Sequence, residues 1–282
     1  MKDQIERAID LMLEQDQNEF LDQLKRLHQI GKYTVRPDGL VDVEGSVDLI
    51  TNLNLTKIPI KFGIVTGYFD CSYKNLTSLE GCPKDVGGYF DCSYNQLTSL
   101  QGAPEKVGSD FYCRDNQLTS LIGSPREVKE NFNCSFNQLT SLEGGPEKVE
   151  EDFNCFHNQL TSLEGCPEKV ESSFYCSDNQ LTSLEGSPQE VEGYFRCAHN
   201  QLTSLQGSPE KVGMGFSCAN NQLTSLIGCP KEVGAEFECR GNPVHFTLED
   251  IELAKQGKAP LGLPLSFVLM KKKEKKFKRG YK

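Results

Sequence analysis

Hydrophobic positions along the chain recur at a fixed step of 21 residues. Phe and Cys stand two residues apart in each unit, and the string Asn-Gln-Leu-Thr-Ser-Leu occurs seven times, first at Asn95 and last at Asn221. The repeated cysteines are Cys71, Cys92, Cys113, Cys134, Cys155, Cys176, Cys197, Cys218 and Cys239. A period of this length is typical of a solenoid, in which each unit buries its apolar side only by stacking on its neighbours.

The spacing within one unit predicts which side chains point inward. Phe153 and Cys155 are two residues apart and therefore lie on the same side of a strand. Leu160 and Leu163 fill the same core from the next turn of the coil. Asn158 is the only polar residue at an inward position, and we expect it to bond backbone groups of the turn that adjacent coils leave unpaired. Repeated from coil to coil, it forms a ladder.

The remainder of the unit is too short for a full helix. Gly144 supplies backbone freedom and Pro146 forces an extended segment. We therefore expect extended or 3₁₀ backbone on this side of the coil.

The order of apolar residues, with Asn five positions and Leu seven and ten positions after Phe153, resembles the leucine-rich repeat, with Phe and Cys in place of the two strand leucines. The resemblance covers about residues 50–245, and the overall look of the repeats is also similar to the short-repeat leucine-rich proteins encoded by bacteria and tailed phages. It implies a leucine-rich-repeat solenoid with a parallel β-sheet on the concave face, an extended or 3₁₀ convex side and α-helical caps.

The ends of the chain depart from the repeat. Apolar residues at helical spacing predict a helix within residues 1–30, and Pro37-Asp38-Gly39 predicts the turn of a β-hairpin. Thr247 and Asp250 resemble a capping box that opens a helix ending near Gln256. We divide the chain into residues 1–45 (helical cap and hairpin), 46–245 (solenoid), 246–270 (capping helix and extended segment) and 271–282 (basic tail).

Charge is distributed unevenly over the 282 residues, whose formal net charge is −10. Residues 271–282 hold eight Lys and Arg and one Glu, whereas the rest of the chain holds 22 Lys and Arg against 39 Asp and Glu. A basic run of this kind is usually disordered and solvated. No apolar run approaches the ~18 residues that a membrane helix needs, and the N-terminus carries no secretory pattern. We expect a cytoplasmic protein, in a bacterium or an infected host cell.

The repeats align with one another, and the positions that vary are not needed to build the coil. The outward positions beside Phe and Cys are rich in aromatic residues and Arg, which dominate protein-interface hot spots. In the first coils they include Tyr68, Asp70, Tyr73, Tyr89, Asp91 and Tyr94. The predicted partner-binding residues are the central group Tyr112, Arg114, Phe136, Phe156, His157, Tyr175, Tyr194, Arg196 and His199. The alternative is that aromatics persist through drift because they suit strands.

The sequence favours no catalytic, cofactor or metal site. The ladder cysteines lie in a line and face the core, whereas zinc needs four ligands around one point. His157 and His199 are two coils apart and belong to no recognisable triad.

We therefore expect a non-enzymatic scaffold that binds a protein, such as a host or defence protein, on the concave face. The alternative is an accessory protein that binds nucleic acid or an anionic membrane through Lys271–Lys282.

Overall fold

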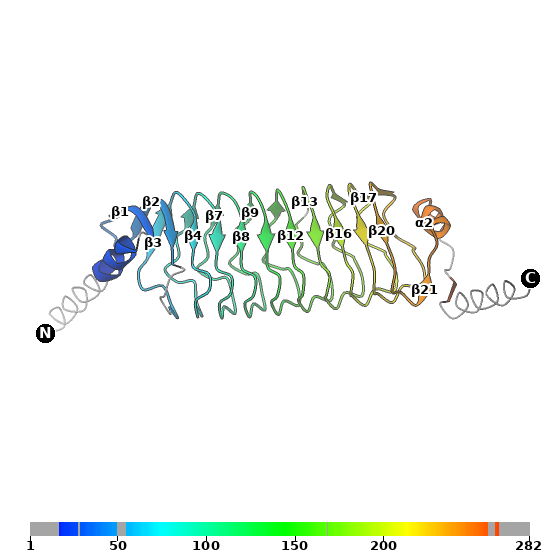
Figure 1. The fold of residues 1–282 in the computed structure, drawn as a ribbon, viewed down its shortest axis with the longest axis horizontal. Coiled ribbons are helices and arrows are strands. Elements are labelled where there is room, and N and C mark those ends of the chain that lie inside the picture. The colour runs from blue at the N-terminus through cyan, green and yellow to red at the C-terminus, as the bar shows by residue number, and fades with distance from the viewer. Residues whose placement is uncertain (1–16, 28, 50–54, 168, 259–262, 265–282) are drawn as a thin grey trace, which may run out of the picture. The chain divides into compact units, whose positions relative to one another are not determined.

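The computed structural model describes residues 17–27, 29–49, 55–167, 169–258 and 263–264 (Figure 1). The chain forms two compact units. Unit 1 comprises Met1–Cys134 with Gly144–Pro146, and unit 2 comprises Ser135–Glu143 with Glu147–Lys282. The predicted helical residues 1–16 and the basic tail 271–282 lie outside the described residues.

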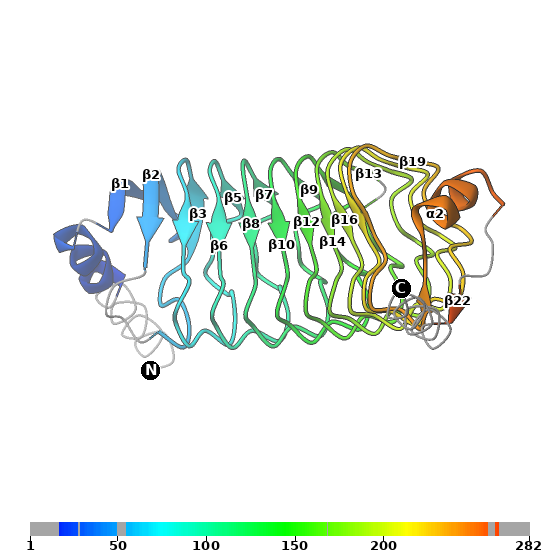
Figure 2. The ribbon, with the colours of Figure 1, turned by 45° about the vertical axis from the view of Figure 1, so that its right-hand side comes forward.

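Each repeat forms one coil with two short strands, one ending at the repeated Val and one beginning at the repeated Phe. In unit 1 the valine row is β5 (Asp85–Val86), β7 (Lys106–Val107) and β9 (Glu127–Val128), and the phenylalanine row is β4 (Phe69–Asp70), β6 (Phe90–Asp91), β8 (Phe111–Tyr112) and β10 (Phe132–Asn133). Strands within a row are parallel and in register, as in the pairing of Phe90 with Phe111. Figure 2 shows β6, β8 and β10 side by side.

Unit 2 repeats the same two rows. Its valine row is β11 (Lys148–Val149), β13 (Lys169–Val170), β15 (Glu190–Val191), β17 (Lys211–Val212) and β19 (Glu232–Val233). Its phenylalanine row is β12 (Phe153–Asn154), β14 (Phe174–Tyr175), β16 (Phe195–Arg196), β18 (Phe216–Ser217) and β20 (Phe237–Glu238). The parallel solenoid fold expected from the sequence is confirmed in both units, and the valine row adds a second strand to each coil that the pattern did not predict.

The core is a stack of identical side chains. Phe90, Phe111 and Phe132 are fully buried in unit 1, with ring centroids 5.3 and 5.4 Å apart along the stack. In unit 2 the rings of Phe174 and Phe195 are stacked at 5.4 Å. Such ring pairs add ~0.5–1.5 kcal/mol each to the burial of their area. The repeated Phe, Cys and Leu therefore form one layered core within each unit, as the spacing predicts.

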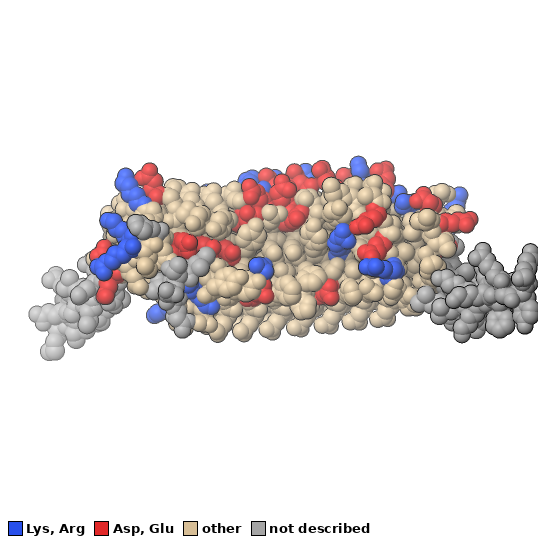
Figure 3. Space-filling model, in the orientation of Figure 1, with Lys and Arg blue, Asp and Glu red and all other residues tan. Residues whose placement is uncertain are grey.

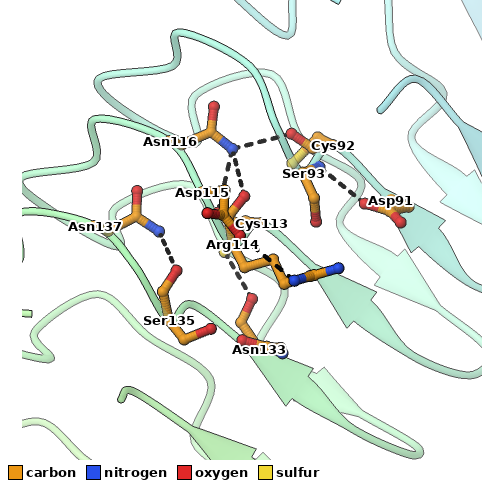
Figure 4. Close-up of polar contacts among 10 residues, drawn as sticks. All are labelled: Asp91, Cys92, Ser93, Cys113, Arg114, Asp115, Asn116, Asn133, Ser135 and Asn137. Carbon is orange, nitrogen blue, oxygen red and sulfur yellow. Dashed lines mark hydrogen bonds and ion pairs between the residues drawn. The ribbon is translucent and has the colours of Figure 1, made fainter. Parts of the chain in front are cut away.

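The repeated asparagine is buried and saturated with hydrogen bonds, as predicted. In unit 1, Asn116 Nδ2 donates to the carbonyl oxygens of Cys92, Cys113 and Arg114 at 3.0, 3.2 and 3.2 Å. Its Oδ1 accepts from the backbone N–H of Leu97 at 3.0 Å. Figure 4 shows the amide between the two coils that it joins. One side chain thus satisfies backbone groups of two consecutive coils, which burial would otherwise leave unpaired.

The residue before each asparagine has left-handed backbone. Its φ lies between 53° and 56° in eight coils, and Gly241 takes this position with φ 72° in the next coil. Left-handed backbone costs ~1–2 kcal/mol in residues other than Gly, Asn and Asp. The eight residues are Tyr73, Tyr94, Asp115, Phe136, His157, Asp178, His199 and Asn220. The strand ends before this position, and the chain turns.

Glycine is required where the coil turns after its last leucine. Gly144 has φ 79°, and a Cβ atom there would lie 2.9 Å from Cα of Ile122 in the neighbouring coil. The close approach and the left-handed backbone together exclude any other side chain without a shift of the chain. This is the backbone freedom that the sequence assigns to Gly144.

Unit 1 begins with a helix and a hairpin. The described helical residues 17–26 bury Leu21 and Leu24, and β1 (Ile30–Val35) pairs antiparallel with β2 (Val41–Asp48). The hairpin turn contains Gly39 with φ 80°, and Asp38 Oδ1 accepts from the N–H of Leu40 at 3.2 Å. The predicted turn is confirmed. β3 (Phe62–Val65) pairs in parallel with β2 and β5 and so leads into the coils.

Unit 2 ends with helix α2 (Leu248–Lys255), and the predicted capping box is confirmed. Thr247 Oγ1 accepts from the N–H of Asp250, and the Asp250 carboxylate accepts from the N–H of Thr247 at 2.7 Å. Beyond the helix, β22 (Leu263–Pro264) pairs with β21 (Val244–His245). The division of the chain into four segments, given in the sequence analysis, stays a prediction.

We expect replacement of one ladder asparagine to destabilise the fold strongly. Asn116→Ala removes the acceptor of the buried Leu97 N–H and one donor from each of three buried carbonyls, and a buried group left without a partner costs ~1–3 kcal/mol. The free energy of unfolding in urea should fall by about 1–3 kcal/mol. Gln117→Ala, at the exposed neighbouring residue, should change it by less than ~0.5 kcal/mol. Equal effects of the two substitutions would contradict the structural role of the ladder.

We expect Asn at the left-handed position to make the fold more stable than the Tyr, Phe or His that several coils have there. His199→Asn should stabilise the protein by about 1 kcal/mol, because Asn tolerates this backbone, and His199→Val should destabilise it, because a branched Cβ does not. The midpoint of urea unfolding measures both effects. The control Gln201→Asn, at an exposed position two residues on, should shift the midpoint little. A His199→Val variant as stable as His199→Asn would show that the backbone is not strained.

Candidate functional site

The surface that varies from coil to coil is the outward side of the phenylalanine row. We call it the strand face: the residues before and after the repeated Phe, the residue after the repeated Cys, and the left-handed residue that follows. The large side chains at these positions are half-buried or exposed. The small ones, such as Ser72, Ser93 and Ser135, are buried beneath their neighbours. The varied positions thus form the surface, while the repeated ones form the core.

In unit 1 the predicted residues Tyr112 and Arg114 are both half-buried on the strand face. The Arg114 guanidinium lies 4.7 Å from the ring centroid of Tyr94 and 3.5 Å from the carboxylate of Asp115. Burial raises the pKa of Tyr112 to about 12, and the negative charge of Asp110 adds to this rise. Neighbours therefore hold the Arg114 guanidinium in place, and the Tyr112 hydroxyl keeps its proton at neutral pH.

The other seven predicted residues lie in unit 2, where ring contacts join three of them. The ring of Phe136, which is 41% exposed, lies 5.3 Å from the ring of Phe156 and 4.8 Å from the ring of His157. Phe156 and His157 are 5.8 Å apart. Three neighbouring rings from two coils form an aromatic cluster that is open to solvent on one side.

A second group in unit 2 combines an aromatic ring with a charge. The Arg196 guanidinium lies 4.6 Å from the ring centroid of Tyr194 and 3.2 Å from the Glu236 carboxylate. Tyr175 is the register partner of Arg196 in the preceding strand. A ring nitrogen of His199 lies 3.0 Å from Asn220 Nδ2. The guanidinium is held between a ring and a carboxylate, which orients it before any partner arrives.

Two tyrosine pairs in unit 1 were not singled out from the sequence. Tyr68 stacks on Tyr89 with ring centroids 4.6 Å apart, and Tyr73 stacks on Tyr94 at 4.2 Å. The signal was present, because each pair occupies the same position of consecutive repeats. Lys74 was also missed. It takes the place of the ladder asparagine in its coil and is only 7% exposed.

Acidic side chains gather beside the strand face of unit 2. Glu150, Glu151, Glu171 and Glu192 line one hollow together with Ser173 of the strand face. Glu150 and Glu171 form ion pairs with Lys148 and Lys169, and the more exposed of these pairs contribute little to stability.

The cysteines are part of the core. Cys92 Sγ donates to the carbonyl of Tyr112 in the next coil at 3.4 Å, and Cys176 Sγ to that of Arg196. Burial raises the pKa of the Cys113 thiol well above its ordinary value, and that of Cys166 to about 12. Metal binding and nucleophilic attack need the thiolate, which these environments disfavour.

In the part of the chain that the structure describes, no group of three or more His, Cys, Asp or Glu side chains is placed to hold a metal ion. Within the same residues, no helix has the length and apolar character to cross a membrane.

Comparison with known proteins gives structural neighbours only. No family model and no curated protein matches the chain. YopM, a leucine-rich effector protein from Yersinia pestis, aligns with 17% identity and a TM-score of 0.46 over 71% of this chain and 67% of its own. YopM from Yersinia enterocolitica aligns with 14% identity and a TM-score of 0.38 over 72% of this chain and 66% of its own. The chain thus spans about two thirds of the length of each.

The architecture itself gives the fold. Each coil contains one 21-residue unit, parallel strands pair in register between coils, and buried asparagines bond the turns of successive coils. These features are shared by both units. They define a leucine-rich-repeat solenoid fold built from short units.

Proposed function

We propose that this protein is a non-enzymatic scaffold that binds another protein through the strand face. The observation that carries the proposal is the choice of residues at the left-handed position. Asp115, Asp178, Asn220 and Gly241 occupy it at little backbone cost. In the other five coils it holds Tyr, Phe or His, which pay that cost. Side chains that remain in spite of a cost to folding are a feature of binding sites.

The strand face has the chemistry of a protein-binding surface. Tyr, Phe and Arg account for most hot spots at interfaces, where they are packed by surrounding residues. In unit 2 the cluster of Phe136, Phe156 and His157 offers exposed apolar area, and Arg196 offers an oriented cation. The core beneath fixes the backbone of these residues. A surface ordered in advance loses little conformational entropy on binding.

The proposed partner-binding residues are those predicted from the sequence: Tyr112, Arg114, Phe136, Phe156, His157, Tyr175, Tyr194, Arg196 and His199. A host or defence protein is the partner class that the resemblance to phage and bacterial proteins favours. The competing function, binding of nucleic acid or anionic lipid through residues 271–282, rests on the charge of that segment.

We expect the full-length chain to capture a partner from a bacterial or host-cell lysate, and the triple variant Phe156→Ala, Tyr175→Ala, Arg196→Ala to lose it. Truncating interface hot spots typically costs more than ~1 kcal/mol each, which for three residues weakens binding at least about a hundredfold. Quantitative mass spectrometry identifies the partner, and titration of the purified partner measures the affinity.

The matched control is the variant Gln159→Ala, Gln180→Ala, Gln201→Ala, which changes three exposed residues of the same unit outside the strand face. It should bind as the unmodified chain does. A fourth bait replaces the Lys and Arg of residues 271–282 by Gln. Loss of the partner only from this bait would assign binding to the basic tail and overturn the proposal.

A further inference from the structure

Three aspartates lie side by side on the strand face of unit 1. Asp48 on β2 pairs in register with Asp70 on β4, and Asp70 with Asp91 on β6. Neighbouring strands are ~4.8 Å apart, and like charges at directly opposed positions of a sheet destabilise it. Burial raises the pKa of Asp70, and the charges of Asp91 and Asp48 raise it further. Asp70, which is 6% exposed, and Asp91 accept from the N–H of Ser72 and Ser93. Asn154 makes the same bond to the N–H of Phe156, so the backbone needs an acceptor oxygen at this position but no charge.

Two cations lie beside this row. Lys74 is buried near Asp48 and Asp70, whose charges oppose the lowering of its pKa by burial. Arg114 acts on Asp91 and also forms an ion pair with Asp115. Figure 3 shows a group of acidic atoms on the viewer-facing side of unit 1 near its N-terminal end.

The stacked tyrosines flank the aspartate row along the strand direction. Tyr68 and Tyr89 precede the aspartates of their strands by two residues, and Tyr73 and Tyr94 follow them by three. Burial raises the pKa of Tyr89, and the charge of Asp70 adds to the rise, which places the Tyr89 hydroxyl close to the carboxylates. The result is an acidic strip with an aromatic wall at each side.

A contact within the protein shows which chemical group packs on these tyrosine rings. The Arg114 guanidinium lies over the ring of Tyr94, beside Asp91. Tyr73, stacked on the same Tyr94, is 61% exposed and held in left-handed backbone. Tyrosine faces attract guanidinium and ammonium groups, and the aliphatic stems of Arg and Lys pack on aromatic rings.

We propose that this strip, formed by Asp48, Asp70 and Asp91 between the two tyrosine pairs, binds an Arg- and Lys-rich peptide segment of a partner protein. The cationic groups of the peptide contact the carboxylates, and the aliphatic parts of its side chains pack on the tyrosine rings. The aspartates stand in a line at strand spacing, which suits a row of side chains and does not converge on one metal ion. The inference rests on the strand face being a binding surface but uses none of the residues changed in the capture experiment.

The test measures binding of a fluorescein-labelled, Arg- and Lys-rich dodecapeptide to the full-length chain by fluorescence anisotropy. A second peptide with Gln in place of each basic residue reports non-ionic binding. We expect binding of the basic peptide only, weakened about tenfold or more by Asp70→Asn with Asp91→Asn, and weakened likewise by Tyr73→Ala with Tyr94→Ala. Asn keeps the acceptor oxygen that bonds Ser72 and Ser93.

The control variant carries Glu105→Gln and Glu127→Gln, two exposed glutamates of unit 1 outside the strip, and removes the same charge. It should bind within about twofold of the unmodified chain, because exposed distant charges are screened by salt. Equal weakening by this control, or binding of the Gln peptide, overturns the proposal. Recovery of peptide binding only after the basic residues of 271–282 are changed to Gln would assign the strip to the chain's own tail and overturn a partner segment as its occupant. Each of these results leaves the unit 2 capture result unaffected.

Discussion

The buried asparagine of each coil is the interaction on which the rest of the structure depends. A 21-residue coil is too short to pair all of its backbone groups within regular strands, and the groups at the turn face the core. One amide, such as that of Asn179, donates to carbonyls of two coils and accepts an N–H from the preceding coil. Because this bonding needs only the asparagine and the backbone, the neighbouring residue is free to vary in its side chain.

The division between repeated and varied positions explains how a uniform core carries a non-uniform surface. Phe, Cys and Leu repeat because each packs against its own copy in the next coil. The residue before the asparagine has only a backbone constraint, left-handed φ, which Asn220 and Gly241 meet cheaply. Tyrosine, phenylalanine and histidine at this position therefore support the proposal that the strand face binds a partner. In unit 1 the varied positions give an acidic strip with tyrosine walls, and in unit 2 an exposed aromatic cluster with an oriented arginine.

Much of the fold could be predicted from the sequence because its determinants are local and repeated. The inward Phe and Cys follow from the period of two in a strand, and the bonding of Asn158 follows from its position among apolar residues. The turn at Gly39 and the capping box at Thr247 follow from local chemistry. The strands of the valine row were not predicted because Pro146 and its neighbours have the sequence pattern of a loop. The left-handed backbone was missed because Tyr and Phe disfavour it, and the tyrosine stacks and buried Lys74 depend on contacts between coils.

The most direct test of this account replaces the aromatic and imidazole residues at the left-handed position by asparagine, the residue that the protein itself uses at Asn220. The five replacements are Tyr73→Asn, Tyr94→Asn, Phe136→Asn, His157→Asn and His199→Asn. Urea unfolding and partner capture are then measured on the same full-length variant. The account predicts an unfolding midpoint at least as high as that of the unmodified chain, while capture is lost. A variant that unfolds at much lower urea, or one that captures the partner as before, would contradict it.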